Sequence, residues 1–271
     1  MDIFTIERRD KHIMRGILIV AALMWIFPAY SAISRSLLFA GLDNYKAVFT
    51  DKVAGTTVFR TLFNSFLVAS IHSVIVVSVA SISGYAFSKM NFWGKNALYL
   101  MTIALMSVPV TVIIAPLFYS LSNMRLINTY AAIFLPEAAL TLPFSVLMMR
   151  NFFDSLPDEL MESGFIDGAS HFKIFSYIYL PLALPALLNL AVLAFMWSFK
   201  DYLNPALFTS NPKIMTATLA VSRFKDSLGG TPRNLGRYFA SLVVISIPII
   251  IVFSYLQKFM RSGILSGSIK E

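Results

Sequence analysis

Six long apolar stretches, separated by polar segments, constrain the fold of this chain more than any other feature of its sequence. They occupy residues 16–33, 62–87, 97–121, 128–149, 182–203 and 238–259. A helix needs about 20 mainly apolar residues to cross a hydrocarbon layer about 30 Å thick, where its backbone polar groups must find partners within the protein. The sequence therefore predicts an all-α integral membrane protein, with six transmembrane helices in a single domain over residues 1–271.

The composition supports the same class. Only 13% of the residues are charged and 57% are hydrophobic, whereas a soluble domain has about 25% charged residues. The net charge of +8 would suggest a nucleic-acid partner in a soluble protein, but the basic residues are scattered among the loops, which favours a lipid surface and no nucleic acid. The absence of cysteine excludes disulfide frameworks and thiolate metal sites, and we expect no bound metal.

Small residues and prolines indicate how the helices pack. Small residues let helix backbones approach closely inside a membrane, and the second stretch contains Ser70, Ser73, Ser78, Ser81, Ser83 and Gly84. The next two stretches contain two prolines each, Pro109 with Pro116 and Pro136 with Pro143. A proline frees a backbone carbonyl, which is tolerated in a membrane only where neighbours or water satisfy it.

The longest acid-rich interruption between the apolar stretches is the loop at residues 150–181. Ser155 and Asp158 have the spacing of a capping box, which predicts a short helix from Glu159 through Phe165. Gly168 should end this helix, and Ser170 should cap a second one. A short helix with both apolar residues and carboxylates, held outside the bilayer, needs a surface to dock against.

The loop also carries a motif. Its residues are Glu162-Ser163-Gly164, Asp167-Gly168-Ala169, Leu180-Pro181-Leu182 and Pro185. This pattern resembles the EAA loop in permease subunits of binding-protein-dependent ABC importers, most closely their carbohydrate, maltose-type branch. The similarity extends to Asn44-Tyr45, Ile127-Asn128-Thr129-Tyr130, Trp197-Ser198-Phe199 and Ser266-Gly267-Ser268-Ile269-Lys270. The chain departs from the family where it has Glu-Ser-Gly instead of Glu-Ala-Ala, and Gly164 should loosen the helix by roughly 1 kcal/mol relative to alanine.

The resemblance implies that the loop is cytoplasmic and couples to an ATP-binding subunit, with Glu162 facing a basic residue there. The implied coupling residues are Glu159, Glu162, Ser163, Gly164, Phe165, Asp167, Gly168 and Ala169. The implied partners are a second homologous permease, two ATP-binding subunits that carry ATP and magnesium, and an extracytoplasmic solute-binding protein. The segment 211–237 is implied to reach toward that binding protein or its sugar. The implied location is the bacterial inner membrane, with several membrane passes and both termini cytoplasmic. Four basic residues before the first stretch agree with that orientation.

The charges inside the apolar stretches are candidates for a translocation path. Glu137 lies in the middle of the fourth stretch, where a carboxylate costs roughly 2.5–3.5 kcal/mol on insertion scales. It either accepts hydrogen bonds from sugar hydroxyls or caps backbone groups freed by Pro136 and Pro143. Lys200 and Asp201 either line the path or form a neighbouring ion pair with their stems along the membrane boundary. Trp197 either stacks on a sugar ring or belongs to an interfacial aromatic belt.

Other classes of function fit less well. The chain has no G-x-x-x-x-G-K-[ST] motif, so we expect it to bind no ATP in the P-loop manner and not to be an enzyme. His72 is the one histidine within an apolar stretch, which excludes a bis-histidine haem of an electron-transfer anchor; we expect it to be hydrogen-bonded to a neighbour. A secondary transporter would need a coupling ion, and the chain shows a single central acid and no internal repeat. We therefore expect a permease subunit that forms half of the path of an ATP-driven carbohydrate importer, the transported sugar being an oligosaccharide. An importer of another small polar solute is the alternative.

Overall fold

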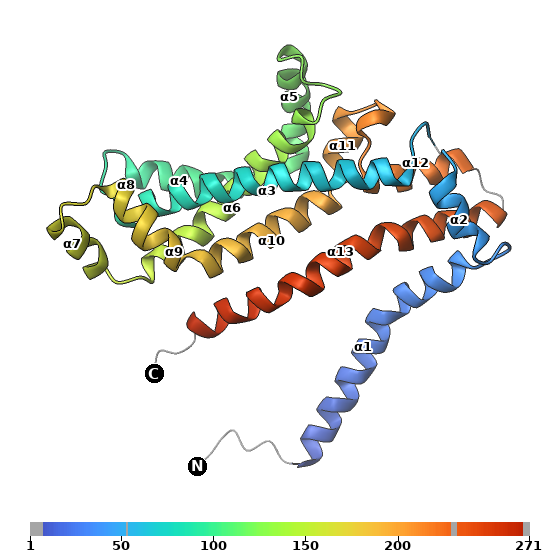
Figure 1. Ribbon diagram of the computed structural model, residues 1–271, viewed down its shortest axis with the longest axis horizontal. Helices are drawn as coiled ribbons and strands as arrows, with labels where there is room; N and C mark the ends of the chain where they lie inside the picture. The colour runs from blue at the N-terminus through green and yellow to red at the C-terminus, as the bar shows by residue number, and fades with distance from the viewer. Residues whose placement is uncertain (1–7, 53, 229–231, 268–271) are drawn as a thin grey trace. The chain divides into compact units, whose positions relative to one another are not determined.

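Every regular element that the structure describes is a helix (Figure 1). The computed structural model describes residues 8–52, 54–228 and 232–267. The long helices are α1 (Arg8–Ser36), α3 (Val58–Lys89), α6 (Ala131–Asp154), α10 (Leu184–Lys200) and α13 (Pro232–Gly267). The shorter ones are α2 (Asp43–Thr50), α4 (Lys95–Leu105), α5 (Val110–Asn123), α7 (Glu159–Ile166), α8 (His171–Ile174), α9 (Leu180–Leu182), α11 (Leu203–Phe208) and α12 (Ala217–Leu228). A π-helix (Phe175–Tyr179) and a 3₁₀ turn (Pro212–Ile214) complete the series.

Among the residues that the structure describes, four helices are long and apolar enough to cross a membrane by themselves. They are His12–Ser36 within α1, all of α3, all of α6, and Asn234–Tyr255 within α13. Two bent helix pairs raise the number of spans to six if each pair crosses once. The predicted class, an all-α membrane protein, is confirmed.

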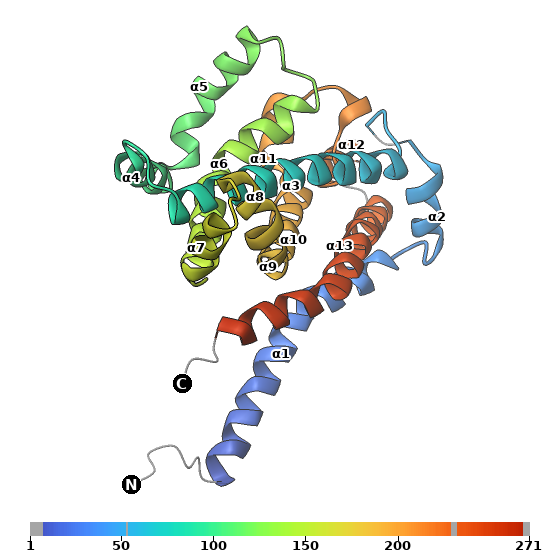
Figure 2. The ribbon, with the colours of Figure 1, turned by 60° about the vertical axis from the view of Figure 1, so that its left-hand side comes forward.

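The third and fifth apolar stretches differ from single straight helices. The stretch 97–121 is divided between α4 and α5, which meet at an angle of 103° (Figure 2). Pro109 lies at this break: it has no N–H to donate to the first helix, and its backbone is extended immediately before Val110. The stretch 182–203 is shorter in the structure, from Leu184 to Lys200, and a bend of 76° separates it from the helical segment His171–Leu182.

The fourth stretch stays helical through both of its prolines. Pro136 and Pro143 lie inside α6, where hydroxyl groups supply extra donors to helix carbonyls. The Thr141 hydroxyl donates to the carbonyl of Glu137 (2.9 Å), and Ser145 donates to the carbonyl of Thr141 (2.8 Å).

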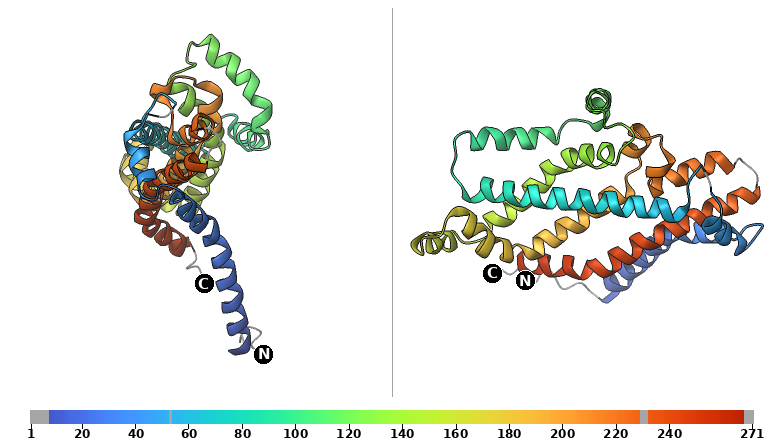
Figure 3. Two further views of the ribbon diagram at one scale, coloured as in Figure 1. Left: turned by 90° about the vertical axis from the view of Figure 1, so that its right-hand side faces the viewer. Right: turned by 45° about the horizontal axis from the view of Figure 1, so that its top comes forward.

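The chain divides into two compact units, of which one comprises Phe59–Ala220 and Ile247–Glu271. Within it, α3, α6 and α10 lie side by side (Figures 1 and 3). One face of α3 is buried along a stripe at helical spacing, Val68, His72, Val76 and Ala80, while Phe63, Val74 and Ile82 are exposed. Gly84 allows the closest contact, because a Cβ there would lie 2.7 Å from the Met149 Cβ and 2.9 Å from the Arg150 nitrogen. The expected role of small residues in close helix packing is confirmed at this position.

The other unit comprises Met1–Val58 and Val221–Ser246. Asn44 lies at the start of α2, and its side-chain amide donates to the carbonyls of Ser36 and Leu38, both at 2.9 Å. Gly236 of α13 packs directly on this corner, since a Cβ there would lie 2.6 Å from the Leu38 carbonyl oxygen. These contacts tie the end of α1 to the beginning of α13.

Candidate functional site

The acid-rich loop forms the two short helices that the sequence predicts, α7 and α8. Gly168 has a positive φ of 74°, and the N–H groups of Gly168 and Ala169 donate to the carbonyls of Phe165 and Gly164, both at 3.0 Å. This pair of bonds is the Schellman arrangement that ends a helix at a left-handed residue. The Ser170 side chain then accepts a bond from the Lys173 N–H at 3.5 Å, as expected for a cap.

The predicted capping box at the start of α7 is wrong. The Ser155 hydroxyl donates backwards to the carbonyl of Phe152 (2.6 Å), at the end of α6. Asp158 occupies the N-cap position of α7 but makes no side-chain cap bond. Its carboxylate instead accepts from the Lys89 ammonium group at 2.5 Å. A partner that is distant in the sequence has therefore replaced the local one.

An aromatic cluster fixes the base of the loop to the helix bundle. Tyr85 of α3, Phe153 of α6, and Phe175 and Tyr179 of the π-helix have ring centroids 5.0 to 6.5 Å apart. Gly164 is buried inside the loop, where a Cβ would lie 2.8 Å from Ile174 of α8. The small residue at this motif position thus serves contact within this chain.

The remaining motif residues are mostly accessible. Exposed side chains or backbone are found at Glu159, Glu162, Ser163, Phe165, Asp167 and Gly168, while Ala169 is half-buried. Two apolar side chains are even more exposed than Phe165, which is 42% exposed: Ile166 at 86% and Phe172 at 76%. The Phe165 ring meets the His171 ring edge-on at 4.8 Å, which brings the end of α7 against the start of α8. We call Phe165, Ile166 and Phe172 the apolar loop patch.

Ile166 and Phe172 were missed as candidate residues by sequence reasoning. The available signal was their position, because two large apolar side chains in a polar loop have no membrane to enter. Large exposed apolar groups beside carboxylates mark a surface for a protein partner more often than a free surface. The loop therefore has the chemical character of a docking surface.

The polar segment after α11 lies at the other end of α3. The Asn64 amide donates to the carbonyls of Lys213 (3.0 Å) and Met215 (2.9 Å), and the Ser65 hydroxyl accepts from the Ala217 N–H (2.8 Å). Lys89, which holds the acid-rich loop, is at the opposite end of this helix of 32 residues. At 1.5 Å per residue the two ends are about 48 Å apart. The two polar segments thus occupy opposite ends of the bundle, whereas residues 229–231 of the expected extracytoplasmic segment lie outside the described residues.

Glu137 lies inside the bundle, 6% exposed, with its carboxyl group directed at Ser198 of α10 and near Asp201. One of its oxygens, Oε2, and the Ser198 hydroxyl have no hydrogen bond of ordinary geometry among the described residues. The carboxyl group of Glu137 is thus directed at the neighbouring helix α10.

His72 is fully buried and bridges three helices. Its Nδ1 lies 3.2 Å from the Ala194 carbonyl oxygen of α10, and its Nε2 lies 3.1 Å from the Thr141 hydroxyl of α6. The expectation that this histidine is hydrogen-bonded to neighbours is confirmed. His72 therefore links α3 to α6 and α10 and has a structural role in the bundle.

Of the two interpretations of Lys200 and Asp201, the structure does not show the neighbouring ion pair, and Asp201 instead caps α11. Asp201 accepts bonds from the Leu203 N–H (2.9 Å) and the Asn204 side chain (2.9 Å) at the start of α11, while Lys200 is exposed. An aspartate at a helix start satisfies free N–H groups, which a lysine side chain cannot do. Trp197 meets the Phe144 ring edge-on at 5.4 Å, so its indole packs between α6 and α10.

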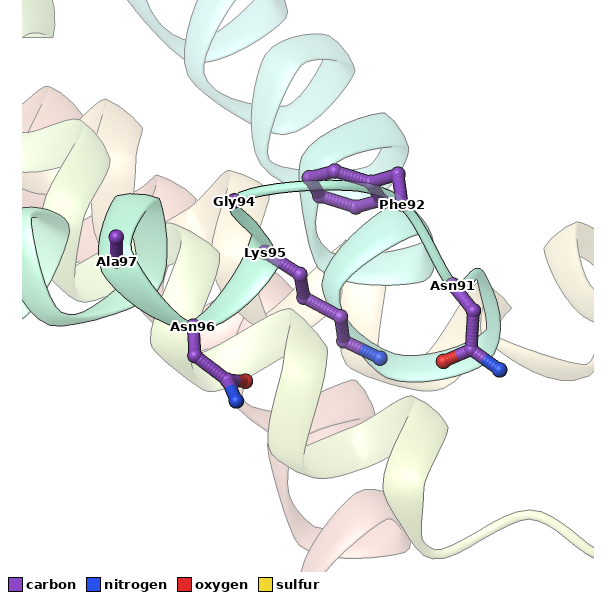
Figure 4. A pocket seen from close by; sticks show the side chains of 6 residues that line it. All are labelled: Asn91, Phe92, Gly94, Lys95, Asn96 and Ala97. Carbon is purple, nitrogen blue, oxygen red and sulfur yellow. The ribbon is translucent and has the colours of Figure 1, made fainter.

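Two hollows in the described part of the chain lie away from these candidate path residues. One is an open pocket at the turn between α3 and α4, lined by Asn91, Phe92, Gly94, Lys95, Asn96 and Ala97 (Figure 4). Its Lys95 ammonium donates to the carbonyls of Met90 (2.8 Å) and Ser88 (3.4 Å), which closes the end of α3. The other, between α3 and α10, is mainly apolar and includes Ser70 and Ser73.

Most of the chain is similar in sequence to known transport proteins. Residues 76–265 match the family described as binding-protein-dependent transport system inner membrane component. The trehalose/maltose transport system permease protein MalG of Thermococcus litoralis is 32% identical over 229 residues, which cover 84% of this chain and 81% of that protein. The arabinooligosaccharides transport system permease protein AraQ of Halalkalibacterium halodurans is 29% identical, covering 84% of this chain and 79% of that protein.

A solved structure shares the fold. A chain of a bacterial ABC transporter involved in the import of the acidic polysaccharide alginate superposes with a TM-score of 0.73 at 20% identity, covering 93% of this chain and 98% of that one. The helical architecture, the loop after α6 and the sequence match are thus consistent with one another. The chain is a multi-pass membrane protein that belongs to the family of inner-membrane components of binding-protein-dependent transport systems.

Proposed function

We propose that this chain is a permease subunit of an ATP-driven carbohydrate importer and forms half of its translocation path. The observation that carries the proposal is the loop of α7 and α8, which exposes apolar and acidic side chains at one end of an apolar helix bundle. The chain also belongs to the family of inner-membrane components of binding-protein-dependent transport systems. The carbohydrate class is supported by the names of the relatives, which mention trehalose, maltose and arabinooligosaccharides. An oligosaccharide is the substrate we expect.

In this proposal the loop docks on an ATP-binding subunit, and the importer contains two such subunits and a second, homologous permease. ATP and magnesium bind to the ATP-binding subunits, because this chain has no P-loop sequence. The family description itself supports a solute-binding protein as a further partner. Closure of the ATP-binding subunits would move the docked loops and tilt the bundles, which alternates access to the path.

The same proposal fixes the orientation. The loop and both termini are cytoplasmic, and the segment 211–237 faces the solute-binding protein outside. Two observations support this assignment. The acid-rich loop and the segment after α11 contact opposite ends of α3, and basic residues precede the first span.

Glu137 is proposed to contribute to the path in another state of the transport cycle. A buried carboxyl oxygen without a partner is costly, and a ligand that arrives when α6 and α10 separate would explain it. We expect Glu137→Gln to raise the sugar concentration needed for half-maximal transport severalfold, with little change in thermal stability. Transport by proteoliposomes and thermal unfolding of the same complex measure both effects.

Thr141→Val is the matched control for this experiment. It keeps the side-chain shape but leaves buried His72 without one partner, which should destabilise the protein by about 1–3 kcal/mol. It should leave the sugar dependence of the remaining transport unchanged. If Glu137→Gln instead lowers stability and leaves the sugar dependence alone, Glu137 is structural and does not line the path.

The proposed function is tested by ATP hydrolysis of the complete complex in the presence of its solute-binding protein. We expect an oligosaccharide to stimulate hydrolysis and to be imported in parallel. Stimulation by another small polar solute, with none by any sugar, would favour the alternative substrate class. Import that proceeds without ATP, driven by an ion gradient, would contradict the proposal altogether.

A further inference from the structure

Lys89 is the last residue of α3, and its ammonium group is almost completely enclosed by the base of the loop. Its side chain is 5% exposed, and it donates to the Leu156 carbonyl at 2.7 Å and to the Asp158 carboxylate at 2.5 Å. The ammonium group also lies 5.7 Å from the centre of the Tyr179 ring. One cation therefore touches the end of α3, the entry to α7 and the π-helix that leads into α10.

The segment that Lys89 holds is where the loop would otherwise bend. Residues 155–158 are not helical and connect α6 to α7. The Tyr179 hydroxyl donates to the Pro157 carbonyl at 3.3 Å, a longer bond than either of those from Lys89. Asp158 is 71% exposed on its side chain, so water can replace Lys89 as its partner. Without the ammonium group the carbonyl of Leu156 would lose its bond to α3.

We propose that Lys89 is a positioning residue of the transport cycle, which locks α7 to α3 so that movement of the docked loop reaches the helix bundle. This inference rests on the proposed docking of the loop, because the force has to enter through α7. The physical reason is that these bonds hold the connection 155–158 and oppose rotation of α7 about it, in addition to the packing of Leu160 and Met161 of α7 against the bundle. A loop free to pivot would follow its partner while α3 stayed in place.

The test uses Lys89→Met and Lys89→Arg in the complete importer reconstituted in proteoliposomes. Methionine preserves the buried stem and removes the charge and the donors. We expect Lys89→Met to insert normally, to retain the ATP-binding subunits, and to hydrolyse ATP within about twofold of the unsubstituted rate. Sugar import per ATP should fall at least about tenfold, because hydrolysis continues without movement of the bundle. Lys89→Arg keeps the charge and the donors, so it should retain most of the sugar import per ATP.

Ser88→Ala is the matched control. Ser88 is the neighbouring residue, and its hydroxyl donates to Asp154 at the end of α6 at 2.6 Å, not to residues 155–158 or α7. Ser88→Ala therefore removes a polar link from α3 to α6 at the same end of the bundle. We expect import per ATP to remain at the unsubstituted value, which separates the hold on the loop from helix packing in general.

A second measurement reports the lock itself, whatever the loop binds. Spin labels on cysteines at Ser163 of α7 and Ile82 of α3, both exposed and in a chain without native cysteine, give a distance distribution in a complex otherwise free of cysteine. Lys89→Met should broaden it and Ser88→Ala should not.

Three results would overturn the inference: unchanged import per ATP, an unchanged distance distribution, or loss of the ATP-binding subunits in Lys89→Met, which would make the residue merely structural. A different result separates the two proposals. If Lys89→Met broadens the distance distribution but substitutions on the loop surface leave the ATP-binding subunit bound, the docking proposal is wrong and the lock between Lys89 and the loop still exists.

Discussion

Ile166→Asp is expected to release the ATP-binding subunit from a permease that still inserts in the membrane. Ile166 is 86% exposed at the end of α7, and burying such a side chain in an interface contributes about 1.5–3 kcal/mol. The aspartate loses that contribution and adds a charge to be desolvated without a partner. A net loss of at least about 3 kcal/mol corresponds to roughly a hundredfold weaker binding. Co-purification of the subunits and transport by proteoliposomes measure the effect.

The control for Ile166→Asp is Asn91→Asp. It adds the same charge at the same end of α3, on an exposed residue outside the loop. We expect it to keep both subunit binding and transport. Glu162→Ala, which removes an exposed carboxylate from α7, should also weaken binding if Glu162 faces a basic residue. Normal binding in both loop variants would contradict the docking surface.

Gly168→Val is expected to abolish most transport by unravelling the end of α7. The residue has φ of 74°, where an L side chain costs about 1–2 kcal/mol and a branched one more. That strain shifts the balance between the formed and the opened turn by a factor of about 5 to 30. Steric contact within this chain plays no part, because a Cβ at Gly168 meets no atom within 4 Å. Transport and subunit co-purification should fall together while membrane insertion is retained.

Gly168→Asn separates backbone strain from the loss of glycine as such. Asparagine enters the left-handed region more readily than other residues with a side chain, so this variant should keep most transport. Equal losses in Gly168→Asn and Gly168→Val would mean that the partner contacts Gly168 directly. Unchanged transport in Gly168→Val would show that the left-handed turn at Gly168 is not needed for transport.

The sequence predicted those parts of the loop that local rules determine. Gly168 and Ser170 were assigned correctly because a left-handed helix end and an N-cap depend on residues within one turn. The apolar stretches 62–87 and 128–149 were likewise recognisable, since length and hydropathy suffice to identify a membrane helix.

Two side chains have other partners than local patterns suggested. Asp158 was assigned to a capping box with Ser155, but Lys89, 69 positions away, takes its carboxylate, and no local pattern contains the information for such a long-range contact. For Asp201, an ion pair with adjacent Lys200 was one of two interpretations, but the N–H group of Leu203 and the side chain of Asn204 take its oxygens. These donors are local too, and they become available only because α11 begins at Leu203.

The bend at Pro109 was missed for a different reason. A proline inside an apolar stretch is compatible with a continuous helix, as α6 shows, and with a break, as α4 and α5 show. In α6, Thr141 and Ser145 donate to helix carbonyls. The residues between α4 and α5 are Met106, Ser107, Val108 and Pro109, and the choice between kink and break depends on tertiary packing.

Site-specific photo-crosslinking in the assembled importer tests the docking surface most directly. A photoreactive amino acid at Phe165 of α7 should form a conjugate with the ATP-binding subunit. The same group at exposed Lys213, held at the opposite end of α3, should form one with the solute-binding protein and none with the ATP-binding subunit. A conjugate between the Phe165 position and the solute-binding protein, with none to the ATP-binding subunit, would contradict both the docking surface and the orientation.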